Sequence, residues 1–368
     1  FVSRIKGDTA YVDFGTGDEV AVPVKRLRKA DVSPADAVRQ INTQYPKNRV
    51  RLKAIGGGGG KGQRIVALGD AERTPELVRE ILAEVKTTGV GDNKNVLVEL
   101  NIETTRHQEI QVIGNGDWCI TLGGRDCSLQ MHEQKLLEVS VTRESLVQAV
   151  EAAERADQAE AAAVLRQDLE TLDTMESEAA VFGLAVGLDS VSTFECIVDR
   201  DQHFFMEMNT RIQVEHPITE QVVDYDLIRE QIMVAAGVPI SGKNYFPQLH
   251  SIECRINAED PYNDFRPSPG KITVLHAPGG HGVRLDTHVY AGYTIPPNYD
   301  SMIAKLITTA QTREEAINKM KRALDEFVIE GIKTTIPFHR QLMEEPDYVA
   351  GNYTTKFMES FVMKDPQE

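Results

Sequence analysis

The feature that most constrains this chain is an alternating segment that runs from Phe204 to Pro217. In an extended chain alternate side chains share a face, so this segment has one apolar and one polar face. The polar face consists of Glu207, Asn209, Arg211, Gln213 and Glu215. Carboxylate oxygens bind divalent cations such as Mg²⁺, and the guanidinium group of arginine can donate two parallel hydrogen bonds to a planar oxyanion. The segment therefore predicts a strand that serves a binding site, and a solvated strand with cross-strand ion pairs is the alternative.

Length, charge and cysteine content exclude several protein classes. The 368 residues are enough for two to three domains, and no apolar run approaches the ~20 residues of a membrane span. A formal net charge of −16 opposes nucleic-acid binding, for which a basic stripe is needed. The four cysteines have no CxxC spacing, which favours reduced thiols and disfavours zinc. No secretory or transit segment is apparent, and since the chain opens on Phe1 we expect it to begin inside a longer product.

The order of predicted helices and strands indicates an α+β protein. A hairpin is predicted within residues 3–24, and Ser33-Pro34 is typical of a helix start. Residues 144–180 contain ten acidic and two basic residues and almost no Gly or Pro, which favours two acidic helices. Such a region is typical of a solvent-exposed helical insertion or of a surface that docks a partner.

Five glycines, Gly56 to Gly60, follow a predicted strand that bears Lys53, and Lys61 follows the glycines. Glycines lack side chains that would keep the backbone away from a phosphate, so their N–H groups can close over a nucleotide. A flexible loop is the alternative. The segment is not a Walker A loop, because it lacks the GKS or GKT ending.

The segment MNTRIQVEHPITE resembles the signature of biotin carboxylases, a branch of the ATP-grasp superfamily. The similarity also covers the glycine loop and the segments RHQEIQ, RDCS and ECRINAEDP. It implies an ATP-grasp fold, in which two α+β lobes clamp ATP, followed by a β-rich C-terminal domain. The division it implies is a hairpin-like segment at 1–32, an ATP-grasp domain at 33–248 with a lid at about 53–68 and an acidic insertion at about 144–182, and a C-terminal domain at 249–368.

The resemblance also implies roles for single residues. The nucleotide would contact Lys53, Gly57, Gly58, Gly59, Gly60, Lys61, Glu99, His107 and Gln130. Two Mg²⁺ or Mn²⁺ ions would be held by Glu195, Glu207 and Asn209, and bicarbonate by Arg211, Gln213, Val214 and Glu215. Among the catalytic residues Lys135, Arg211, Glu215 and Arg284, Glu215 would be the base, Lys135 would neutralise the transferring phosphoryl group, and Arg284 would stabilise the biotin enolate.

The implied reaction is ATP- and bicarbonate-dependent carboxylation of biotin through carboxyphosphate, the first half-reaction of a biotin-dependent carboxylase. An acetyl-, propionyl- or other acyl-CoA carboxylase is favoured. Because the chain has no Met-Lys-Met segment, biotin is expected on a carrier domain or another chain. A carboxyltransferase subunit and an oligomer are the expected partners, and the expected location is the cytoplasm, or the mitochondrial matrix in a eukaryote.

Three features depart from the family pattern. The usual N-terminal α/β domain does not precede Ser33, Glu133 stands where the family has a histidine, and the acidic insertion lengthens the chain. Two other functions therefore stay open: a non-catalytic scaffold or pseudo-enzyme subunit, and an ATP-grasp ligase of carbamoyl-phosphate type. Arg284 and the Ala291-Gly292-Tyr293 segment argue against the latter.

Overall fold

The structure is a computed structural model. It describes the backbone of residues 2–6, 9–13, 19–23 and 86–87, and all atoms of residues 33–54, 62–85, 95–103, 105–131, 134–199, 201–238 and 246–364. No helix within these ranges combines the length and apolar composition that a membrane crossing requires. The chain divides into two compact units, residues 1–104 with 132–134, and residues 105–131 with 135–368. The predicted three-part division of the chain stays a prediction.

The first unit begins with a three-stranded antiparallel sheet of β1 (Val2–Lys6), β2 (Thr9–Asp13) and β3 (Glu19–Pro23). Asp13 pairs with Glu19 across β2 and β3. The predicted hairpin is therefore confirmed, and β1 extends it by one strand.

A second small sheet of the first unit has the order β5-β4-β6 and is packed against two helices. Its elements are β4 (Val50–Ala54), β5 (Gln63–Val66), β6 (Val96–Leu100), α1 (Pro34–Gln44), the 3-10 turn η2 (Ala71–Arg73) and α2 (Thr74–Thr87). Helix α1 begins as predicted, because the Ser33 side chain accepts a hydrogen bond from the Asp36 N–H. Val50 and Leu52 on β4 are buried against Val38 and Ile81 of the two helices.

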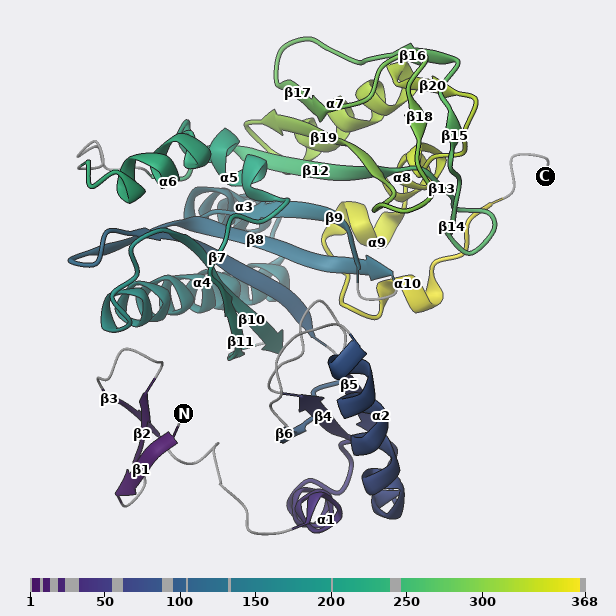
Figure 1. The fold of residues 1–368 in the computed structure, drawn as a ribbon. Helices are drawn as coiled ribbons and strands as arrows, with labels where there is room; N and C mark the ends of the chain where they lie inside the picture. The colour runs from purple at the N-terminus through teal and green to yellow at the C-terminus, as the bar shows by residue number, and fades with distance from the viewer. Residues whose placement is uncertain are drawn as a thin grey trace. The chain divides into compact units, whose positions relative to one another are not determined.

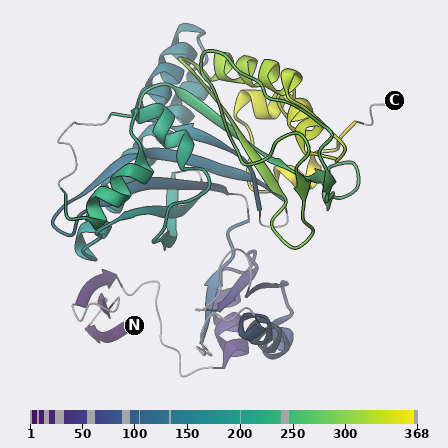
Figure 2. The ribbon, with the colours of Figure 1, turned by 45° about the horizontal axis from the view of Figure 1, so that its top comes forward.

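The second unit is built on one eight-stranded sheet with the order β11-β10-β7-β8-β9-β12-β19-β17. Its strands are β7 (Arg106–Gly114), β8 (Cys119–Met131), β9 (Gln134–Val141), β10 (Val191–Asp199), β11 (Gln202–Asn209), β12 (His250–Asn257), β17 (Val283–Thr287) and β19 (Met302–Ala310). Figures 1 and 2 show the blue strands β7 and β8 continuing into the green strands β12 and β19 as one sheet.

Helices cover both faces of this sheet. The acidic helices α3 (Arg143–Arg155) and α4 (Ala159–Ala185) are present as predicted (Figure 1). Leu172 and Met175 of α4 share a buried hydrophobic cluster with Ile110 of β7. Helices α5 (His216–Val223) and α6 (Leu227–Ala235) share a hydrophobic cluster with Ile113, which is three residues after Ile110 on β7 and therefore on the opposite face of the strand. Since Glu109 shares its strand face with Ile113 and not with Ile110, it points away from α4.

The C-terminal part of the chain adds short strands and four helices. The strands are β13 (Glu259–Asp260), β14 (Arg266–Pro267), β15 (Gly270–Lys271), β16 (Val274–His276), β18 (Thr294–Ile295) and β20 (Val328–Glu330), and the helices are α7 (Arg313–Glu326), α8 (Ile336–Leu342), α9 (Pro346–Ala350) and α10 (Phe357–Ser360). The sequence predicts one final helix at about 313–329. Helix α7 ends earlier, and the three short helices after it were not predicted.

The alternating segment is only partly a strand, and this corrects the prediction of one extended chain to Pro217. Strand β11 ends at Asn209, residues 210–215 form a loop, and Glu215 is the N-cap of α5. The reason lies in Pro217, because proline at the first turn favours a helix start. Gln213 and Glu215 nevertheless remain buried.

Candidate active site

A row of charged side chains crosses four adjacent strands of the large sheet. Strand register pairs Glu207 of β11 with Glu195 of β10, Glu195 with Glu109 of β7, and Glu109 with Arg125 of β8. Residues directly opposite each other on antiparallel strands point to the same face. We call Glu207, Glu195, Glu109 and Arg125 the charged row.

Arg125 is fully buried and stands at the β8 end of the charged row. Its Nε donates to Glu109 Oε1 at 2.6 Å, and its Nη1 donates to Gln111 Oε1 and to Thr219 Oγ1, both at 2.7 Å. Its Nη2 donates to Gln213 Oε1 at 3.0 Å. A charge-assisted set of this kind fixes both partners, so Arg125 ties β7 to the loop before α5.

Lys135 of β9 gathers three carboxylates. Its Nζ donates to Glu109 Oε2 at 2.7 Å and to Glu215 Oε1, and it lies 3.6 Å from Glu195 Oε1. Burial would lower the pKa of Lys135, but the surrounding negative charges outweigh burial and raise it well above the usual value. Burial would likewise raise the pKa of Glu109, but Lys135 and Arg125 hold it below the usual value.

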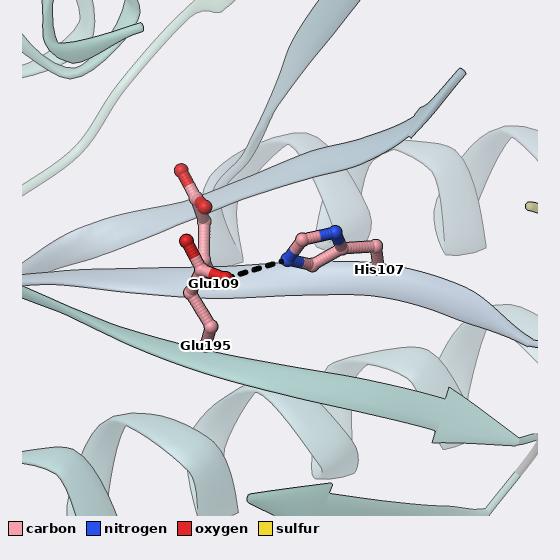
Figure 3. Close-up of side chains that lie close together, drawn as sticks. All are labelled: His107, Glu109 and Glu195. Carbon is pink, nitrogen blue, oxygen red and sulfur yellow. Dashed lines mark hydrogen bonds and ion pairs between the residues drawn. The ribbon is translucent and has the colours of Figure 1, made fainter. Parts of the chain in front are cut away.

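Glu195 lies beside His107 and Glu109 in Figure 3. His107 Nε2 is 3.1 Å from Glu195 Oε2, and Gln130 Nε2 is 2.7 Å from His107 Nδ1. Because an amide nitrogen can only donate, this arrangement assigns the ring proton to Nε2, which donates to Glu195. Although burial would raise the pKa of Glu195, the hydrogen bond from His107 and the charge of Lys135 lower it to about 2.

The Glu195 carboxylate also accepts hydrogen bonds from two amides. Asn209 Nδ2 donates to Oε1 at 2.7 Å, and Gln213 Nε2 donates to the same oxygen at 2.5 Å. An ionised carboxylate with Glu207 on the neighbouring strand gives oxygen ligands of the kind a hard cation takes. The donor set therefore fits Mg²⁺ or Mn²⁺.

Glu215 is buried between two cations at the start of α5. Lys135 Nζ contacts its Oε1, and Arg255 Nη2 of β12 donates to its Oε2 at 3.0 Å. A carboxylate has about four lone-pair sites, so each oxygen keeps capacity for a further donor. Arg211, four residues earlier, is exposed, and its one hydrogen bond to the described residues goes to the Ile212 carbonyl oxygen at 3.4 Å.

Val214 is held by a hydrogen bond from a lysine, and Arg284 is held by ion pairs. Lys305 Nζ of β19 donates to the Val214 carbonyl oxygen at 2.9 Å. Arg284 of β17 donates to both oxygens of Asp286 at 2.9 Å and to Glu220 Oε2 at 2.7 Å. These bonds use three of its five N–H donors, so two remain within the part of the chain described here.

The remaining predicted nucleotide residues belong to the first unit. Lys53 lies on β4, and Glu99 lies on β6 opposite Arg51 of β4. Because Leu52 is buried against α1 and α2, the alternation places Lys53 and Glu99 on the other face of this sheet. The predicted residues Gly57, Gly58, Gly59, Gly60 and Lys61 lie outside the described residues, as does Glu133.

Sequence reasoning missed three charged residues of the candidate site. Glu109, Arg125 and Arg255 stand in the segments RHQEIQ, RDCS and ECRINAEDP, but no role was assigned to these three residues. The available signal was the position of Glu109 two residues after His107, since both share one strand face. No comparable pattern in the sequence singles out Arg255.

Comparison with known proteins gives consistent matches. Residues 253–360 match the family described as biotin carboxylase C-terminal domain, and residues 18–167 and 140–243 match the carbamoyl-phosphate synthase L chain, ATP binding domain. The chain is 47% identical over 324 residues to biotin carboxylase 1 of Bacillus subtilis, covering 86% of this chain and 65% of that protein. It is 40% identical over 370 residues to the biotin carboxylase of Haemophilus influenzae, covering 96% of this chain and 75% of that protein.

A solved structure is similar over most of the chain. The biotin carboxylase domain dimer of Hydrogenobacter thermophilus 2-oxoglutarate carboxylase, in complex with MgADP, ADP and bicarbonate, is 36% identical with a TM-score of 0.75. The match covers 87% of this chain and 66% of that one. The chain thus spans about two thirds of the length of several relatives that it matches. Identity at this level over both matched regions means that the chain belongs to the biotin carboxylase family.

Proposed function

We propose that this chain is the biotin carboxylase component of a biotin-dependent carboxylase, using ATP and bicarbonate to carboxylate biotin on a carrier domain or protein. One observation carries the proposal. Glu215 is a buried carboxylate held between Lys135 and Arg255, and the exposed Arg211 lies four residues before it. The similarity to a biotin carboxylase domain that was solved with MgADP and bicarbonate supports the same reaction.

In this proposal bicarbonate binds at Arg211, Gln213, Val214 and Glu215. The Arg211 guanidinium has free N–H donors in the described part of the chain, and its fork matches a planar oxyanion. Glu215 takes the bicarbonate proton, because its oxygens are fixed by Lys135 and Arg255 and each retains a lone pair. Lys135 stays protonated amid its carboxylates and balances charge on the phosphoryl group.

Glu195, Glu207 and Asn209 would hold Mg²⁺ or Mn²⁺, which when bound supplies positive charge to the nucleotide phosphates. The ionised state of Glu195 suits this role. His107, Gln130, Lys53 and Glu99, with Gly57 to Gly60 and Lys61, would contact the nucleotide. In the described contacts His107 also orients Glu195.

Biotin, when bound, would supply the ureido nitrogen that accepts the carboxyl group. Arg284 would direct its two remaining N–H donors at the ureido oxygen, with Asp286 and Glu220 fixing the guanidinium plane. A carrier domain, a carboxyltransferase subunit and an oligomeric assembly complete the proposal. We favour an acyl-CoA as the final acceptor, with a 2-oxo acid as the alternative; carbon-14 from bicarbonate recovered in an acyl-CoA product of the native complex would distinguish the two.

The test is phosphate release from ATP with Mg²⁺, measured without bicarbonate, with bicarbonate, and with bicarbonate plus free biotin. We expect bicarbonate-dependent release that biotin increases. Glu215→Gln removes the base and should lower this release about 10²–10⁴-fold while ATP binding changes little. Glu170→Gln, on the exposed surface of α4, is the matched control and should leave release unchanged.

Bicarbonate-dependent release that persists in Glu215→Gln would contradict the role of Glu215. A wild-type chain that binds ATP and carrier but releases no phosphate under any of the three conditions would contradict the proposed reaction and favour a scaffold. Stimulation by ammonia or glutamine in place of biotin would instead indicate a carbamoyl-phosphate-type ligase.

A further inference from the structure

Two buried glutamates of the large sheet share a single cation, Arg255, which bonds to one of them only. Glu138 of β9 and Glu253 of β12 stand directly opposite each other in the strand register. Residues so paired point to the same face with Cβ atoms about 4.5–5.5 Å apart. Both side chains are fully buried.

Three of their four carboxyl oxygens have no hydrogen-bond partner among the described residues. Glu138 Oε1 accepts from Arg255 Nε at 2.6 Å, whereas Glu138 Oε2 and both oxygens of Glu253 are without a donor. A buried carboxylate that lacks donors is costly, so native proteins either pair it or neutralise it. A proton between the two side chains would supply one donor and remove one charge.

The nearby cations already bond to groups other than Glu253. The charged and titratable groups around the two glutamates are Cys127 on β8, Lys135 on β9, Cys254 and Arg255 on β12, Lys305 on β19, and Glu215 at the start of α5. Arg255 faces Glu138 and Glu215, and Lys305 donates to Val214 and lies 3.7 Å from Asp286. Each of these contacts leaves Glu253 without a direct partner.

We propose that Glu138 and Glu253 share one proton, held mainly on Glu253, and that this pair is a positioning device that fixes Arg255 against the base Glu215. The ionised Glu138 faces Arg255 on one oxygen and receives the Glu253 proton on the other. Arg255 then presents Nη2 to Glu215 Oε2. The positioning role rests on the proposed function, whereas the shared proton does not.

Electrostatics agrees with this assignment. Burial raises the pKa of Glu138 to about 7 despite Arg255, and burial together with the charge of Glu138 raises the pKa of Glu253 well above its usual value. A proton retained by the folded state but lost by the unfolded state means that the unfolded state binds fewer protons. Stability should therefore fall as pH rises from about 4.5 through the pKa of the pair.

The first experiment measures the shared proton without using activity. Urea unfolding of the full chain is followed from pH 5 to pH 9 for the wild type and for Glu253→Gln. Glutamine is neutral and keeps an N–H donor for Glu138, so the variant lacks the titration. We expect the midpoint of the wild type to fall, relative to that of Glu253→Gln, as pH rises. A difference that is constant with pH would overturn the shared proton.

The second experiment measures positioning through kcat/KM for bicarbonate, with KM for ATP as the internal reference. Glu253→Leu removes the donor to Glu138 and should lower kcat/KM for bicarbonate about 10–100-fold, with KM for ATP nearly unchanged. Glu253→Gln should recover most of that loss, whereas Glu138→Gln, which removes the charge facing Arg255, should not. Equal losses in Glu253→Gln and Glu138→Gln, or none in Glu253→Leu, would overturn the proposal. Absence of wild-type turnover would count against the proposed function, and the unfolding experiment would still decide the shared proton.

Discussion

Single buried ion pairs determine how rigid the candidate site is. Arg125 exemplifies this, because its guanidinium serves Glu109, Gln111, Thr219 and Gln213 from one fully buried position. Removal of such a cation leaves several polar atoms without a partner in a region that water does not reach. The free-energy cost then comes mainly from the groups left behind.

Arg125→Met should lower the free energy of unfolding by about 3–5 kcal/mol, as expected when a buried charge loses its partner. Arg166→Met is the control, because the exposed Arg166 of α4 pairs with the exposed Glu154 of α3, and its loss should cost less than about 1 kcal/mol. Urea denaturation of the two variants checks the contrast. Similar losses in both would mean that the Arg125 network contributes little.

At the scale of elements, the close approach of α4 to the sheet depends on one glycine. A Cβ added to Gly183 would lie 2.4 Å from Cys119 Sγ and 3.3 Å from Cys119 Cβ on β8. The space between helix and strand is thus filled by the cysteine. Although alanine favours helices over glycine, the clash should prevail here.

Gly183→Ala should therefore destabilise the protein by about 1–2 kcal/mol, the overpacking cost less the gain in helix propensity. In a Cys119→Ala background the same substitution should cost much less, because the sulfur is gone. Thermal unfolding of the four proteins of this double-mutant cycle measures the coupling. An identical cost in both backgrounds would locate the strain elsewhere.

The elements that the sequence predicted best have strong local signals. Ser33-Pro34 marked the start of α1, and the acidic run marked α3 and α4, because capping and helix propensity act within a few residues. Helices α8 to α10 were missed, because segments of four to seven residues have too few positions to show a helical period.

Residue spacing alone indicated a site only in one segment, and the family resemblance added Lys135, Glu195 and His107. Glu207 to Glu215 were found together because they follow one another, even though the strand ends at Asn209. Glu109, Arg125 and Arg255 acquire their meaning from strand register, which brings together residues far apart in the chain. Register is set by the packing of the whole sheet and is not visible in any one segment.

At the scale of the whole molecule, buried ionisable groups make stability depend on pH in two opposite ways. Burial lowers the pKa of His250 to about 3 and that of His339 to about 4, so both are neutral in the folded state. In the unfolded state each imidazole gains its proton near pH 6.5, so stability from these groups is lost as pH falls. The raised pKa of Glu138 acts in the reverse direction.

His250→Leu should separate the two effects. Because the unfolded wild type binds one more proton than the variant below about pH 6.5, the stability of the wild type relative to the variant should decline steadily between pH 6.5 and pH 4. Urea midpoints of both proteins at half-unit steps measure the decline. A constant difference would show that His250 takes up its proton as readily in the folded state as in the unfolded state.

The strand order also affects how the chain must be assembled during synthesis. Arg125 and Glu109 are 16 residues apart on neighbouring strands, so they can meet early, whereas Arg255 is made 117 residues after Glu138. Until Arg255 emerges, the cluster holds four carboxylates and two cations, namely Glu109, Glu138, Glu195, Glu215, Arg125 and Lys135. If the chain collapsed around these residues before Arg255 is made, it would bury two more negative than positive charges. The desolvation free energy would be several kcal/mol for each buried ion. The nascent chain should therefore stay open at this point until β12 arrives.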